Sequence, residues 1–186
     1  MHFLIAKLFQ DIRSEDKKIS EDAAIDLSVI LEMHAWNLSK EQRESRYDSL
    51  VTHQELFNLE LDDSSLMEIV KFMQSEIENG NWLKSSLLSS MGRASARIGL
   101  IPLIETIENE IERFNENELY QALIALERIM FWDESLSIQE VRDIFNKTNL
   151  LEEIAAKLLS LMPILHSGLE STTARLLSRL ILLRQH

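Results

Sequence analysis

Residues 86–105, SLLSSMGRASARIGLIPLIE, carry the clearest structural pattern in the chain. Their apolar residues recur at intervals of three and four, which is the spacing of an amphipathic α-helix. Gly99 suits the left-handed position that ends a helix, and Pro102 suits the first turn of a new one. The stretch therefore predicts two helices, one that ends near Ile98 and one that begins after Gly99.

The same helical spacing continues in both directions, over almost the whole chain. No clean alternation of polar and apolar residues predicts a strand, and 4 glycines, 2 prolines and 6% aromatic residues leave few turn and strand formers. A chain of 186 residues is long enough to bury one core. We therefore expect a single all-α domain over residues 1–186, with eight to ten helices stacked as antiparallel hairpins.

Capping residues, glycines and prolines give the expected helix boundaries. Ser39 and Gln42 have the spacing of a capping box, and Ser137 precedes another periodic segment. The predicted helices are 3–12, about 20–38, about 40–59, a segment between Asp63 and Asn79, 82–98, 102–114, 118–131, 138–145, 150 to Pro163, and 170–183. The sixth of these is expected to bury Leu103, Ile104, Ile107, Ile111 and Phe114.

Adjacent aliphatic pairs recur along the chain at a period of 35 to 37 residues, which suits a stack of helical hairpins. The pairs are Leu50-Val51, Leu87-Leu88, Leu123-Ile124 and Leu158-Leu159. Leucine-rich helices often produce such pairs, so an irregular helical bundle is the alternative architecture.

Residues 82–114 resemble one HEAT-type repeat that runs into the next. Small residues and Gly92 stand where two helices of such a repeat pack closely, and a turn with Gly99 and Pro102 precedes an apolar helix. Looser similarity follows at 118–131 and 150–162, and the first third of the chain departs from the pattern. The resemblance implies an α-solenoid that binds another macromolecule, and it implies no particular activity.

The chain is strongly acidic, with 31 acidic residues against 19 lysines and arginines and a net charge of −12. This charge disfavours nucleic acid and anionic membranes as partners and favours a basic protein. The absence of cysteine from the sequence excludes disulfides, thiolate catalysis and cysteine-ligated zinc.

No residue set specifies a reaction. The five histidines have no metal-ligand spacing, and no glycine-rich phosphate loop is present. His34 falls on the apolar face of its helix, so we expect a hydrogen-bonded core histidine there. The sequence therefore predicts no cofactor, no metal site and no enzyme. The N-terminal residues lack a cleavage site, and no apolar run is long enough for a membrane span, so a cytoplasmic protein is expected.

Acidic side chains concentrate at two places, and each is a candidate surface for a basic partner. The first is a stripe along the sixth predicted helix, made of Glu105, Glu108 and Glu112. The second surrounds the start of the fourth and is made of Glu60, Asp62, Asp63 and Glu68. Trp82, Tyr120 and Trp132 lie at helix ends, where an aromatic side chain can anchor a partner. Solvated surface and core packing are the alternative interpretations.

Three functions follow from these features. In size, charge and helical character the chain resembles bacterial immunity proteins, which cover the active site of a cognate toxin domain, often a basic nuclease. A HEAT-like scaffold or adaptor is the alternative. A third hypothesis is an enzyme or ligand-binding domain, which a cluster of Arg93, Arg97 and Arg128 on one face would favour. The sequence leaves the partner's identity and the oligomeric state open.

Overall fold

The computed structural model describes residues 2–161 and 167–185. Within these residues the chain forms ten α-helices, two short 3-10 helices and no strand, which confirms the all-α prediction. The α-helices are α1 (Phe3–Ile12), α2 (Lys17–Ala35), α3 (Lys40–Tyr47), α4 (Asp63–Glu78), α5 (Lys84–Met91), α6 (Ala96–Glu110), α7 (Glu116–Phe131), α8 (Ile138–Phe145), α9 (Leu150–Leu161) and α10 (Ser167–Gln185). The 3-10 helices are η1 (Gln54–Asn58) and η2 (Ile111–Arg113).

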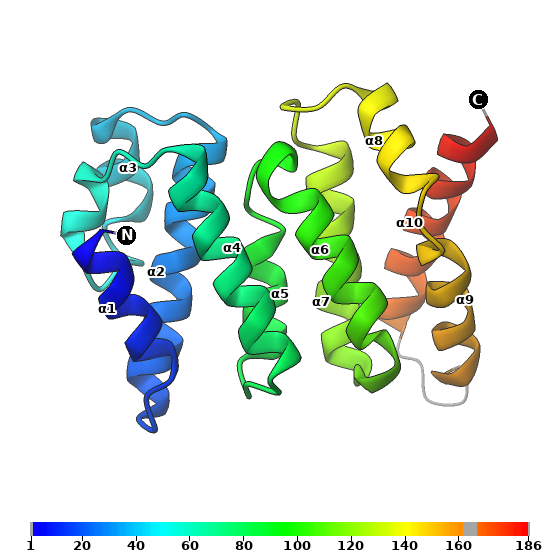
Figure 1. Cartoon of the computed structure of the whole chain (residues 1–186), viewed down its shortest axis with the longest axis horizontal. Coiled ribbons are helices and arrows are strands. Elements are labelled where there is room, and N and C mark those ends of the chain that lie inside the picture. Colours follow the sequence, from blue (N-terminus) through cyan, green and yellow to red (C-terminus); the bar gives the residue numbers. More distant parts are fainter. Residues whose placement is uncertain (1, 162–166, 186) are drawn as a thin grey trace.

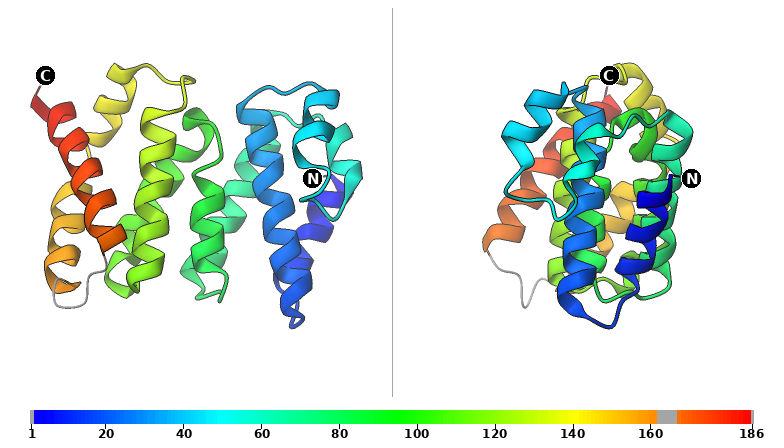
Figure 2. Two further views of the ribbon diagram at one scale, coloured as in Figure 1. Left: turned by 180° about the vertical axis from the view of Figure 1, so that it is seen from behind. Right: turned by 90° about the vertical axis from the view of Figure 1, so that its left-hand side faces the viewer.

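The long helices lie in two layers (Figure 1). A front layer contains α1, α4, α6 and α9, and a back layer contains α2, α5, α7 and α10, which faces the viewer in the left panel of Figure 2. Front helices run in one direction and back helices in the other, so successive helices form antiparallel pairs. Viewed along the long axis, α3 and α10 stand out on the same side as the back layer (Figure 2, right).

Apolar side chains between the two layers form one continuous core. The stripe of α6 and η2 is buried as predicted, from Leu103 to Phe114. Phe9 of α1 stacks on Phe72 of α4 with ring centroids 3.8 Å apart, which joins the first pair to the second. Burial of these amphipathic faces is the main source of helix stability here, because isolated helices of this length are marginal in water.

Local capping signals predict several helix ends correctly. Ser39 forms the expected capping box with Gln42. Ser137 precedes a helix as expected, and the structure shows that it forms a capping box with Glu140. The helix after Ser39 is nevertheless much shorter than predicted, since α3 ends at Tyr47. Buried Arg43 donates to the carbonyls of Phe57 and Leu59, 3.3 and 2.9 Å away, and so folds the following loop back onto α3.

The break between α5 and α6 lies nearer the N-terminus than Gly99 and Pro102 predicted. The fifth helix ends at Met91, and α6 begins at Ala96, so Gly99 and Pro102 both lie inside α6. Residues from a distant loop cap this helix: Asp133 Oδ1 accepts the Ala96 N–H at 2.9 Å, and Ser135 Oγ accepts the Arg97 N–H at 3.1 Å.

Two glycines allow α5 and α6 to pack closely against α7. A Cβ at position 92 would lie 2.5 Å from the Cα of Ala125 on α7, and one at position 99 would lie 2.8 Å from Ile129 Cδ1. Real Cβ atoms do not approach so closely, so α5 and α6 reach α7 only because these side chains are absent. This close contact agrees with the packing role expected for Gly92.

The proposed 35- to 37-residue period is wrong at both ends. Leu87-Leu88 and Leu123-Ile124 do lie on neighbouring back-layer helices, α5 and α7. Leu50-Val51 instead lies in the loop after α3, and Leu158-Leu159 lies on α9 of the front layer. Pro163 lies outside the described residues. None of the described helices is both long and apolar enough to cross a bilayer.

Candidate functional site

The predicted acidic stripe lies on the front layer, where α9 packs beside α6. Glu105 and Glu112 are exposed, and Glu108 is half-buried, with its Oε1 accepting the Asn149 N–H at 3.2 Å just before α9. Two carboxylates that the sequence analysis did not include, Glu152 and Glu153, approach the stripe from α9. We call these five glutamates the acidic seam.

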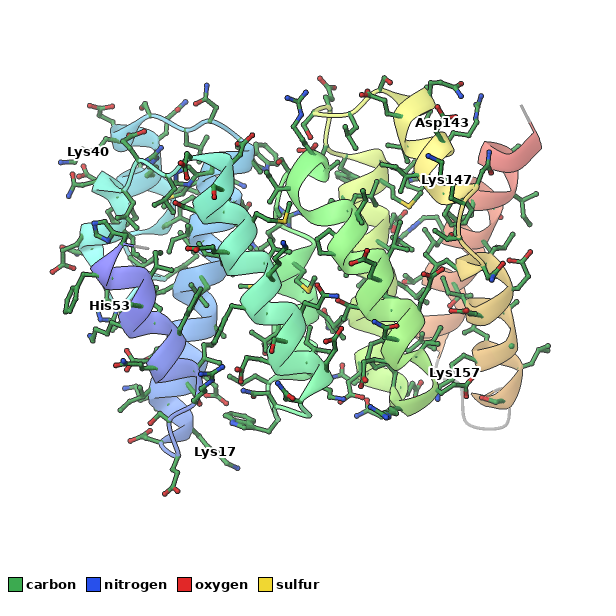
Figure 3. The ribbon with its side chains drawn as sticks, in the orientation of Figure 1. Lys17, Lys40, His53, Asp143, Lys147 and Lys157 are labelled. Atoms are coloured by element: carbon green, nitrogen blue, oxygen red, sulfur yellow. The ribbon has the colours of Figure 1, made fainter. Side chains whose placement is uncertain are left out.

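Negative charge on four of the five glutamates of the acidic seam is poorly compensated. Within the described residues no ion pair reaches Glu105, Glu108, Glu112 or Glu153. Burial, followed by the charges of Glu108, Glu112 and Glu152, raises the pKa of Glu153 above its ordinary value. Lys157 lies nearby on α9 (Figure 3), but its Nζ donates to the Glu112 backbone carbonyl at 2.8 Å.

The second acidic group has structural partners. Asp62 caps α4 by accepting the Ser65 N–H at 2.9 Å, and this bond lowers the pKa of its carboxyl. Glu60 lies 3.7 Å from Arg43, while Asp63 and Glu68 are exposed. This group lies at the opposite end of the layers from Glu112, so the structure does not join the two predicted surfaces.

The aromatic candidates differ in exposure. Trp82 is 52% exposed just before α5, and Lys17 lies 5.6 Å from its ring centroid. Tyr120 is half-buried near the start of α7 and packs on the core. Both lie at the end of the molecule where α6 finishes near Glu112, whereas Trp132 follows α7 at the opposite end.

A cleft of about 460 Å³ opens on the back layer, between the ends of α2 and α5, the middle and end of α7, and α3 and α10. Its lining carries Arg46, Arg93, Arg128, Arg175, Trp36 and Trp132, together with Glu32, Glu127 and Asp133. We call this the arginine cleft. Its four arginines outnumber its three acidic side chains by one, so the cleft has a small excess of positive charge on a strongly acidic chain.

Two buried glutamates organise the arginine cleft. Glu32 is 3% exposed and pairs with three arginines: Arg93, with Arg128 at 3.1 Å and Arg46 at 3.3 Å. Burial alone would raise the pKa of Glu32, but the charges of Arg93 and Arg128 outweigh burial and lower it. Glu127 accepts two hydrogen bonds from Arg175, at 2.7 and 2.6 Å.

Only part of this cluster could be predicted from the sequence. Arg93 and Arg128 meet at Glu32 as the third hypothesis required, but Arg97 lies outside the cleft and donates to the loop at Ser135. Glu32 and Arg175 were missed, because partners separated by 61 and 48 residues leave no local spacing pattern.

The histidines have structural partners. His34 Nδ1 lies 2.9 Å from the Ile30 carbonyl, and its Nε2 lies 3.3 Å from the Leu61 nitrogen, so the predicted hydrogen-bonded histidine is confirmed. Buried Asp26 lies 2.7 Å from His53, whose Nε2 lies 2.6 Å from Lys7 (Figure 3 labels His53 beside α1). This chain of contacts resembles a catalytic dyad, but no hydroxyl group of the described residues bonds to it. It connects the loop after α3 to α1 and α2.

No metal centre is present in the described part of the chain, where no group of three His, Asp or Glu side chains has a metal-binding arrangement. Comparison with protein-family models, with curated proteins and with solved structures finds no match for this chain.

Proposed function

We propose that this chain is a non-catalytic inhibitor of the immunity type, which binds a basic toxin domain, such as a nuclease, through the acidic seam. The observation that carries the proposal is the row of Glu105, Glu108 and Glu112 along α6 and η2, with Glu153 of α9 beside it and no ion pair to any of the four within the described residues. Repulsion between such like charges costs some stability in the isolated chain. Lysine or arginine side chains of a partner would relieve it on binding.

The chemistry of a nuclease fits this surface. A nuclease active site is lined with cations that bind phosphates, and a row of carboxylates offers the same charge with a different scaffold. Trp82 is 52% exposed at the same end of the molecule as Glu112 and supplies aromatic surface for the rim of that interface. Tyr120 packs on the core and lies near Arg175, so it contributes less. An adaptor that binds a basic partner without inhibiting it is the alternative.

Charge reversal tests the proposal. The chain is used to capture its basic partner from the source cell, and the partner's catalytic activity is then assayed with and without the chain. Glu105→Lys with Glu112→Lys is expected to weaken binding about 100-fold and to relieve inhibition in proportion. Both side chains are exposed, so the fold should be unaffected.

The matched control is Asp63→Lys with Glu68→Lys, which makes the same charge change at two exposed positions of the other acidic group. If this control weakens binding and the seam variant does not, the interface lies at the start of α4. Tight binding with no loss of the partner's activity would contradict inhibition and support the adaptor.

A further inference from the structure

The arginine cleft has a charge opposite to that of the acidic seam and lies on the other layer, so the inhibitor function leaves it unexplained. We propose that it binds a small organic anion: a planar ring that carries a phosphate or a carboxylate. The proposal goes beyond the immunity function and stands independently of it.

The anion-binding part is built around Glu32. Three guanidinium groups surround one carboxylate, which is more cation than its neutralisation requires. Each guanidinium has five N–H donors in a fixed fork that matches phosphate and carboxylate oxygens. Arg128 and Arg93 each spend one nitrogen on Glu32, so this buried carboxylate holds them in place and leaves other donors for a ligand.

The walls of the cleft suit a ring. Trp36 and Trp132 are 56% and 73% exposed, and both line the cleft beside the apolar side chains of Ala94, Ile124 and Ile129. The guanidinium of Arg46 lies 5.0 Å from the ring centroid of Trp36, so we assign the stacking to the more exposed Trp132. An indole face stacks well on a planar ring. Large apolar side chains that stay in water at a lined cavity are typical of binding sites.

Size and charge limit the occupant to a small molecule. A volume of about 460 Å³ lies within the range of small-ligand pockets. A polynucleotide would bring many phosphates against a chain with a net charge of −12, and this repulsion extends well beyond the arginine cleft. A ligand with one anionic group meets the arginines without that penalty.

A titration of the intact chain tests the site, with tryptophan fluorescence and calorimetry as readouts. The probes are AMP, indole-3-acetate, adenosine and inorganic phosphate. Saturable binding of AMP or of indole-3-acetate at least tenfold tighter than that of adenosine and of phosphate would support the proposal, and the better probe identifies the anionic group. No binding of either below about 1 mM would overturn it.

Variants locate the binding. Trp132→Ala and Arg128→Gln are each expected to weaken the better probe about tenfold or more. Trp132 is 73% exposed, so its variant should keep the fold even if Arg128→Gln loosens the cluster. The matched controls are Trp82→Ala, another half-exposed tryptophan, and Arg13→Gln, whose arginine pairs with buried Glu76 at 2.6 Å.

Each outcome of the variants is decisive. Weaker binding in Trp132→Ala with unchanged binding in both controls supports the site. Equal affinity in Trp132→Ala and the parent chain would overturn it, as would tighter binding of a single-stranded oligonucleotide than of AMP. Loss of toxin inhibition in the seam variants has no bearing on these titrations, so the two proposals fail separately.

Discussion

In the acidic seam and in the arginine cleft, the pKa of a buried or partly buried carboxyl group is shifted in opposite directions. In the cleft, Glu32 is nearly inaccessible, yet three arginines lower the pKa of its carboxyl. In the seam, Glu153 is less buried, yet burial and neighbouring carboxylates raise the pKa of its carboxyl. Neighbouring charges, and not depth of burial alone, therefore set the direction of the pKa shift of a carboxyl group.

The largest expected effect is a loss of stability when the charge of Glu32 in the arginine cleft is removed. Glu32→Gln keeps the side-chain shape but removes the charge that three arginines share. We expect a loss of about 3 kcal/mol in the free energy of unfolding, because like-charged guanidiniums are then left together in a partly buried site. Urea denaturation measures it. Glu76→Gln, where one arginine is paired, should cost clearly less.

The pH dependence of that loss follows from the direction of the pKa shift. The folded-state pKa of Glu32 is depressed below its ordinary value of 4.5, so its stabilisation is fully present above that value. It is lost as the pH falls below about 4.5 through the folded pKa. The difference between Glu32→Gln and the parent chain should therefore shrink in acid, and a difference that grows there would contradict the assignment.

A smaller and opposite effect is expected in the seam. Glu153→Gln should stabilise the chain by about 0.5 kcal/mol at neutral pH, because it removes a partly buried charge and its repulsion from Glu108, Glu112 and Glu152. The raised pKa of Glu153 means that its protonated form is favoured on folding. The gain from the variant should therefore disappear below about pH 4.5, where the carboxyl of the parent chain is protonated in both states. Thermal unfolding at two pH values measures this.

The smallest expected effect on the free energy of unfolding is at Glu105 in the acidic seam. Glu105 is exposed, so Glu105→Gln should change the free energy of unfolding by no more than about 0.2 kcal/mol. Added salt should abolish even this change. A stabilisation as large as that of Glu153→Gln would show that repulsion is spread evenly along the seam and is not focused where α6 meets α9.

Local signals in the sequence predict much of the fold. The capping boxes at Ser39 and Ser137, the stripe from Leu103 to Phe114 and the extent of α1 all follow from neighbours within a few residues. The start of α6 does not, because its cap comes from Asp133, a residue 37 positions away.

The acidic seam and the arginine cleft could also be predicted from the sequence only where they depend on local patterns. The stripe Glu105–Glu112 follows from helical periodicity, whereas its extension by Glu153 depends on how α9 packs against α6. The arginine cleft brings together residues of α2, α3, α7 and α10 and of the segments that follow α2, α5 and α7. The sequence pointed to Arg93 and Arg128 as a possible cluster and to Trp132 as an aromatic anchor, but it did not predict that the three lie in one cleft. The other members of both sites come together only through tertiary packing.

The contact between Gly92 and Ala125 constrains how related sequences can diverge. A side chain gained at position 92 would meet the Cα and the carbonyl oxygen of Ala125, which every residue at position 125 retains, so no second substitution there makes room for it. Homologues are therefore expected to keep Gly at position 92. Because Gly92 also lines the arginine cleft, the packing that requires this glycine also keeps one part of the cleft wall free of a side chain.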